Sequence, residues 1–145
     1  MEPHFKKYLH SIGMAEIFCE RTEFVISLCN KIYEGKISEI FVNDYTDKDG
    51  IRNYPSLWLF RESGFVNELK NFLTEFSCDA LFLINNLSYW EIKALEYDLE
   101  NSSDKSRLLL NIRFHNNCSG TFQGSKSNCD KLAKIFKELI VPNMR

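Results

Sequence analysis

The hydrophobic pattern of this chain changes its period twice, and this change constrains the fold more strongly than any other feature. Residues 3–34 repeat apolar side chains at the spacing of an amphipathic helix. Residues 36–125 instead form short apolar runs between turn residues, which is typical of β-strands. Residues 127–141 return to helical spacing. Because the strands follow one another without intervening helices, the pattern predicts an α+β fold with an antiparallel sheet or sandwich and a C-terminal capping helix.

The N-terminal segment, residues 1–35, predicts two helices. Gly13 interrupts the helical pattern after a short first helix, and Gly35 ends the second as a residue at the C′ position would. The second helix carries one apolar stripe, which we expect to dock on the rest of the fold. The members of this stripe are Phe18, Val25, Leu28, Cys29 and Ile32.

The central segment predicts a series of strands joined by short turns. The expected strands are 37–45, 54–60, 65–76, 79–84, 89–99, 107–115 and 120–124. Residues 65–76 are ambiguous from the pattern alone, because Phe65, Leu69 and Phe72 also fit helical spacing. Asp49-Gly50 is a turn signal, since glycine readily takes positive φ. The large aromatic residues Trp58, Phe60 and Trp90 are expected in the core, and any of them that is exposed would be an interface anchor.

The C-terminal helix has the clearest boundaries. Ser127 stands where an N-cap would, with Asp130 three residues later in the place of the acid of a capping box. Pro142 follows the last periodic residue and is expected to stop the helix.

Length and composition bear on the number of domains, on nucleic-acid binding and on the location of the protein. A chain of 145 residues, 44% of them hydrophobic, predicts one domain over residues 1–145. The formal net charge of −2 lacks the basic excess of a nucleic-acid-binding domain, so we expect no direct nucleic-acid binding. The sequence has no apolar run long enough to span a membrane and no secretory signal pattern, so a cytoplasmic protein is expected.

The five cysteines give no metal or disulfide signature. They are odd in number and widely spaced, and no Cys-x-x-Cys occurs. The histidines lie at no zinc-ligand interval from them, so neither a metal nor another cofactor is expected. The cysteines are interpreted as small buried apolar residues, with a reactive thiol at Cys129 as the alternative, because that residue lies near a helix start.

Acidic residues form two groups that favour binding over catalysis. No pair of carboxylates is placed recognisably for acid–base chemistry, and no hydrolase or kinase motif is present, so the chain is expected not to be an enzyme. Acidic patches steer and bind basic partners. The candidate partner-binding residues are Asp44, Asp47, Asp49, Glu96, Asp98, Glu100 and Asp104.

Two further features leave alternatives open. Lys131, Lys134 and Lys137 could face anionic lipid headgroups, although such lysines are also the ordinary wet side of an amphipathic helix. The Gly120–Ser127 segment has glycines and a lysine like those of a phosphate-binding loop, but their spacing differs from that motif. An enzyme acting through this segment or Cys129 ranks last.

The strand series and the final helix resemble a pleckstrin-homology-like domain over residues 37–141. The resemblance is carried by Ser106-Arg107-Leu108-Leu109-Leu110, then Gly120-Thr121-Phe122, then the helix from Asn128 to Ile140. In that fold a strand hairpin would occupy residues 57–72, so the resemblance favours a strand for the ambiguous segment. It also implies the alternative function of a lipid- or protein-binding adaptor.

A second resemblance concerns function. Leu57-Trp58-Leu59-Phe60, Tyr89-Trp90-Glu91-Ile92, Asp104-Lys105-Ser106-Arg107-Leu108 and Pro142-Asn143 are similar to small bacterial proteins encoded beside polymorphic or contact-dependent toxins. This resemblance implies an immunity protein that neutralises a cognate toxin by occluding its active or substrate-binding surface. The expected partner is a basic toxin domain, such as a nuclease.

Overall fold

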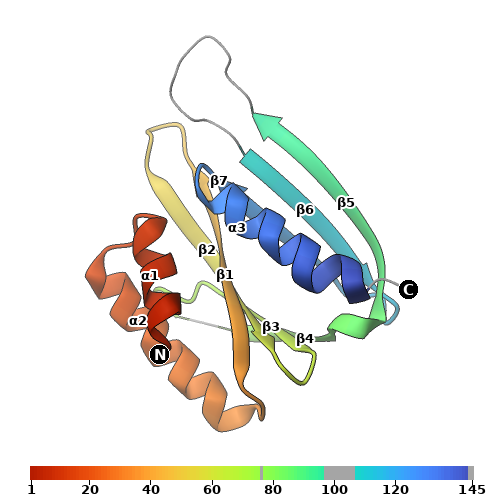
Figure 1. Cartoon of the computed structure of the whole chain (residues 1–145). Coiled ribbons are helices and arrows are strands. Elements are labelled where there is room, and N and C mark those ends of the chain that lie inside the picture. The colour runs from red at the N-terminus through yellow and green to blue at the C-terminus, as the bar shows by residue number, and fades with distance from the viewer. Residues whose placement is uncertain (76, 97–106, 144–145) are drawn as a thin grey trace. The chain divides into compact units, whose positions relative to one another are not determined.

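A computed structural model of the chain describes residues 1–75, 77–96 and 107–143 (Figure 1). The fold is α+β, as the pattern predicts. Two helices, α1 (Pro3–Ser11) and α2 (Glu16–Ile32), come first, and α3 (Asn128–Ile135) comes last. Between them lie β1 (Ile37–Thr46), β2 (Arg52–Arg61), β3 (Phe65–Lys70), β4 (Ser77–Leu83), β5 (Leu87–Glu96), β6 (Arg107–Phe114) and β7 (Ser119–Ser125).

The strands form two sheets in sequence order. One sheet has the order β1-β2-β3-β4 and the other β5-β6-β7. β2 pairs antiparallel with β3, with Trp58 opposite Glu68, which confirms a strand in the first half of the ambiguous segment. Residues 71–75 form turns instead, so the predicted strand ends early at Lys70. In the second sheet β6 pairs antiparallel with both β5 and β7.

The chain divides into two compact units. The first contains Met1–Val42 and Tyr54–Leu81, and the second contains Asn43–Asn53 and Phe82–Arg145. The tip of the β1–β2 hairpin therefore belongs to the second unit, whereas the rest of both strands belongs to the first. The expectation of one domain over residues 1–145 stays a prediction.

In the first unit, α1 and α2 cover one face of the strands (Figure 1). Alternate residues of β1 and β2 supply that face, among them Ile40, Val42, Leu57 and Leu59, all fully buried. Polar contacts fasten the helices to the strands. The Val42 amide donates to Tyr8 Oη at 3.0 Å, and Tyr54 Oη donates to the Ile12 carbonyl at 2.9 Å.

The end of α1 is set by Gly13. Its φ of +84° is a left-handed conformation that glycine adopts without strain. The Gly13 amide donates to the His10 carbonyl and the Met14 amide to the Leu9 carbonyl, at 3.0 and 3.2 Å. These two bonds define a Schellman motif, which ends α1 and turns the chain sharply into α2.

Two expectations for α2 need correction. Its buried side is formed by Cys19, Thr22, Val25, Ile26 and Cys29. Phe18 and Ile32, assigned to the apolar stripe, are instead 39% and 69% exposed. The buried side includes Thr22, whose hydroxyl is satisfied inside the fold because it donates to the Phe18 carbonyl at 2.7 Å. Gly35 lies one residue beyond the C′ position, since α2 ends at Ile32 with Tyr33 as its C-cap.

In the second unit, α3 packs along β6 and β7 (Figure 1). The buried side chains on the strands are Leu110, Ile112, Phe114 and Phe122, and those on the helix are Leu132, Ile135 and Ile140. The predicted helix over 127–141 is present, but it changes to π-helical turns at Phe136–Ile140. Ser127 has helical backbone angles, and among the described residues no side-chain hydrogen bond caps α3, so the expected capping box is wrong.

Candidate functional site

The tip of the β1–β2 hairpin is organised by one carboxylate, Asp47. Its Oδ1 accepts hydrogen bonds from the amides of Asp49 and Ile51, each at 2.9 Å. Its Oδ2 accepts from the Asn53 side-chain amide at 3.3 Å. These donors, the Ile51 amide first among them, lower the pKa of Asp47 below its ordinary value of 3.8. The tip therefore carries a carboxylate that is charged at neutral pH.

Asp44, also a candidate partner-binding residue, is fully buried. Its Oδ2 lies 2.6 Å from Arg52 Nε. Its Oδ1 accepts from the Asn128 side-chain amide at 2.6 Å and from the Ser125 amide at 3.1 Å. The Asp44 carboxylate therefore joins the hairpin tip to β7 and α3 inside the second unit. It is not part of an exposed acidic surface.

The other predicted acidic residues have different placements. Asp49 is exposed beside Asp47, so the structure brings these two together at the tip. Glu96 is the last residue of β5, and its side chain is outside the described part of the structure. Asp98, Glu100 and Asp104 lie outside the described residues.

Strand β5 exposes three large side chains, of which Trp90 is expected in the core from the sequence. Tyr89, Trp90 and Ile92 are 46%, 38% and 40% exposed. All three of Trp58, Phe60 and Trp90 are expected in the core from the sequence; the burial of Trp58 and Phe60 is confirmed, whereas Trp90 is exposed. One side of its ring packs edge-on against Phe136, with the ring centres 4.9 Å apart. β5 is an edge strand of its sheet, which explains why its side chains are covered less completely.

Charged residues accompany the exposed β5 side chains. Glu91 Oε1 lies 3.5 Å from Lys93 Nζ, and both side chains are about half exposed. The guanidinium of Arg113 lies 5.8 Å from the centre of the Tyr89 ring. We define the β5 surface as Tyr89, Trp90, Glu91 and Ile92. Because side chains alternate along a strand, Tyr89 and Glu91 lie on one face of this edge strand, and Trp90 and Ile92 lie on the other, on which Phe136 packs.

The three lysines of the C-terminal helix differ in their exposure to solvent. Lys134 and Lys137 are exposed and Lys131 is half-buried. The change from α- to π-helical turns falls between Lys134 and Lys137, so a regular three-residue repeat does not describe their positions.

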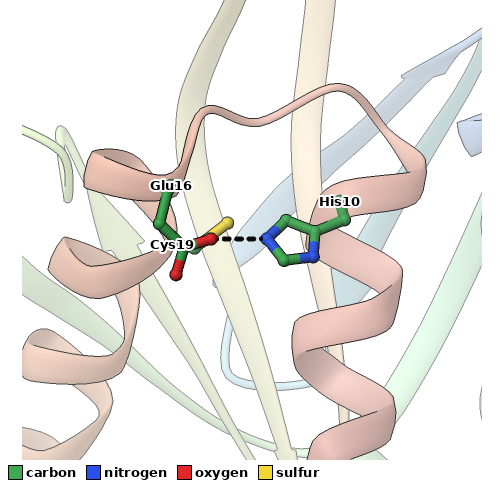
Figure 2. A group of neighbouring side chains, drawn as sticks. All are labelled: His10, Glu16 and Cys19. Carbon is green, nitrogen blue, oxygen red and sulfur yellow. Dashed lines mark hydrogen bonds and ion pairs between the residues drawn. The ribbon is translucent and has the colours of Figure 1, made fainter.

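A third group, in the first unit, joins His10, Glu16 and Cys19 (Figure 2). Their potential ligand atoms all lie within 4.8 Å of one another. His10 Nε2 lies 2.8 Å from Glu16 Oε2, and Lys6 Nζ lies 3.0 Å from Glu16 Oε1. Sequence reasoning missed this group because the three residues are not separated by a short, recognisable ligand spacing. It is the Schellman turn at Gly13 that brings His10 to α2.

The three residues differ in their surroundings. Burial raises the pKa of the Cys19 thiol, whose side chain donates weakly to the Met14 carbonyl at 3.8 Å. Hydrogen bonds from Lys6 and then His10 lower the pKa of Glu16, so this carboxylate is charged at neutral pH.

The cysteines agree in part with their interpretation as small buried apolar residues. Cys19 and Cys29 are buried, and Cys118 and Cys129 are half-buried; all four are free thiols in the described part of the chain.

Among the described residues, no helix combines the length and apolar character needed to cross a membrane. Comparison with protein-family models, with curated proteins and with solved structures found no match.

Proposed function

We propose that this chain is a non-enzymatic immunity protein that binds a basic bacterial toxin domain in the cytoplasm and occludes its active or substrate-binding surface. The observation that carries the proposal is the β5 surface. Three large apolar or aromatic side chains, Tyr89, Trp90 and Ile92, are each at least 38% exposed on one edge strand. Tryptophan and tyrosine are the residues most often found at the energetic centre of protein interfaces.

Charge supports a basic partner. β5 runs directly into the acidic stretch that contains Glu96, Asp98, Glu100 and Asp104. Asp47 and Asp49 provide a second acidic position in the same unit. A nuclease domain presents arginines and lysines to its substrate, and carboxylates that pair with such residues increase the association rate and select the partner.

A pleckstrin-homology-like scaffold is part of the proposal. It is supported by the strand order, in which four neighbouring strands are followed by three more and then by one helix. Scaffolds of this kind host many binding functions, so the scaffold by itself does not choose the partner.

The test is co-expression with the product of the neighbouring reading frame. Rescue of growth and recovery of a stoichiometric complex are the expected results. Asp49→Lys, Asp98→Lys and Asp104→Lys should slow association and reduce its dependence on salt. Tyr89→Ala should weaken the complex by about 2 kcal/mol, roughly 30-fold in Kd.

Glu20→Lys is the matched control, because it makes the same charge change at an exposed position of α2 in the first unit. Binding that is unaffected by the four test variants, or equally weakened by the control, would remove the β5 surface and the acidic residues from the proposal. Failure of every neighbouring product to bind would remove the immunity function itself.

The adaptor alternative is separated by a different measurement. Lys134 and Lys137 are exposed and could contact anionic headgroups. Co-sedimentation with phosphatidylserine vesicles that is lost in a Lys134→Glu, Lys137→Glu double variant would favour the adaptor function. Equal sedimentation with neutral and anionic vesicles would end that alternative.

A further inference from the structure

We propose that His10, Glu16 and Cys19 form a zinc-binding site that fastens the end of α1 to the start of α2. The three potential ligand atoms come from two helices and lie within 4.8 Å of one another. The site lies wholly in the first unit and is independent of the toxin-binding proposal.

The ligand set matches the chemistry of Zn²⁺. Zinc is bound in proteins by histidine nitrogen, cysteine sulfur and carboxylate oxygen, and these are the three groups present here. Calcium and magnesium take oxygen ligands, so an imidazole and a thiol disfavour them. Three protein ligands leave one position of a tetrahedral zinc ion for water or an external donor.

The backbone brings the three potential ligands close to one another. Glu16 and Cys19 are three residues apart on α2, so they lie on one side of that helix. His10 belongs to the last turn of α1, and the Schellman turn at Gly13 directs it toward α2 (Figure 2). The short connection thus preorganises three ligands, of which the first and last, His10 and Cys19, are nine positions apart in sequence.

Burial and existing hydrogen bonds fit an ion held between the two helices. The Cys19 residue is 1% exposed, whereas the His10 and Glu16 side chains are 48% and 54% exposed. An ion would therefore have the sulfur on its inner side and the other two ligands on its solvent side. Lys6 forms an ion pair with Glu16 Oε1, so Glu16 Oε2 is the oxygen available to the ion. Binding of the ion would replace the present contact between Glu16 Oε2 and His10 Nε2.

The charges balance on binding. The Cys19 thiol must release its proton to solvent, because the thiolate is the ligand. The site then contains a thiolate and a carboxylate, whose two negative charges offset those of Zn²⁺. The positive charge of Lys6 next to the carboxylate remains outside that balance.

The experiment uses the full chain in its reduced form. Co²⁺ is the spectroscopic probe, since a thiolate bound to it produces near-ultraviolet charge-transfer absorption, and Zn²⁺ is then titrated by displacement of the cobalt. We expect one equivalent to bind with that absorption. His10→Ala and Glu16→Gln should each weaken Zn²⁺ binding by more than about 100-fold, because loss of even an outer partner typically costs about 10–100-fold.

Matched controls are available on the same helices. His4→Ala on α1 and Glu20→Gln on α2 remove the same groups at exposed positions outside the cluster, and Cys118→Ser removes a half-buried thiol elsewhere. These three should bind Zn²⁺ as the unmodified chain does. Because Cys19→Ser changes a buried residue, folding of that variant must be checked by circular dichroism, and the two exposed ligand variants provide the test without it.

Two results would overturn the proposal. One is the absence of thiolate charge-transfer absorption with Co²⁺. The other is absorption that persists unchanged in His10→Ala and Glu16→Gln, which would show that neither side chain is a ligand of the metal.

Discussion

The buried carboxylate of Asp44 accepts a hydrogen bond from the side-chain amide of Asn128 at 2.6 Å, across 84 positions of sequence. Arg52 and Ser125 complete the surroundings of the same carboxylate. A buried charge is tolerated when it is paired and its remaining lone pairs accept hydrogen bonds, and both conditions hold here. Asp44 is therefore a central polar contact of the second unit.

Replacing Asp44 tests that role. Asp44→Ala leaves Arg52 and Asn128 without their carboxylate, and removal of one member of a buried ion pair costs about 3–5 kcal/mol. The free energy of unfolding, measured by urea denaturation, should fall by that amount. Asp44→Asn keeps the shape but removes the charge, and should cost less, about 1.5–3 kcal/mol.

Asp49→Asn is the control for these variants, because Asp49 is an exposed residue of the same hairpin. It should change the free energy of unfolding by no more than about 0.5 kcal/mol. Equal effects of Asp44→Asn and Asp49→Asn would mean that the buried network does not stabilise the unit.

A second prediction concerns Gly124, where β7 passes close to the start of α3. A Cβ added there would lie 2.8 Å from the Asn128 carbonyl oxygen, a backbone atom that cannot move independently. Gly124→Ala should therefore force α3 away from the strand and lower the free energy of unfolding by about 1–3 kcal/mol. Gly50→Asn is the comparison, since no atom lies within 4 Å of a Cβ there and asparagine tolerates the positive φ of +78°. A smaller loss at Gly124 than at Gly50 would contradict this account.

The third prediction concerns the loss of stability at low pH through protonation of Asp47. Because the pKa of Asp47 is lowered in the folded chain, the stability that its charged form contributes is present above pH 3.8. That contribution is lost as the pH falls below 3.8 through the pKa of the folded state. NMR titration should show the amide resonances of Asp49 and Ile51 moving together with a midpoint below 3.8.

Two variants separate the charge of Asp47 from its hydrogen bonding. Asp47→Asn retains an oxygen acceptor and should abolish the titration while the turn persists. Asp47→Ala should remove both the titration and the protection of the two amides from hydrogen exchange. A midpoint at or above 3.8 in the unmodified chain would show that the two amide bonds are absent in solution.

The fourth prediction concerns the α1–α2 connection. Gly13→Ala puts a Cβ at a φ of +84°, and the left-handed conformation costs an ordinary L-residue roughly 1–2 kcal/mol. Unfolding by urea should show that loss, and Gly13→Asn should show a smaller one. A neutral Gly13→Ala variant would indicate that the Schellman turn does not form.

The elements of this fold were largely predictable from local patterns. The expected strand over residues 37–45 is found as β1 at Ile37–Thr46, and the one over residues 107–115 as β6 at Arg107–Phe114. Alternation with a period of two reports a face of a sheet directly. Residues 65–76 show the limit of this reasoning. Their spacing fitted a helix, yet pairing with β2 makes Phe65–Lys70 a strand.

The candidate sites were much less predictable. Asp44, Asp47 and Asp49 read alike in sequence, but Asp44 is buried and Asp49 is exposed. The difference depends on donors from β7 and α3, more than 80 positions away. Likewise, the grouping of His10 with Cys19 depends on the angle of one turn and not on a recognisable interval.

The order and type of the elements follow from local sequence patterns, because the period of apolar residues is a local property that reports which side chains leave water. The positive-φ positions at Gly13 and Gly50 belong to the same local information. Which polar groups become internal contacts and which stay at the surface depends instead on contacts between segments far apart in the sequence. Burial of a carboxylate such as Asp44 is favourable only when its partners from distant segments converge on it, and a local pattern contains no record of that convergence.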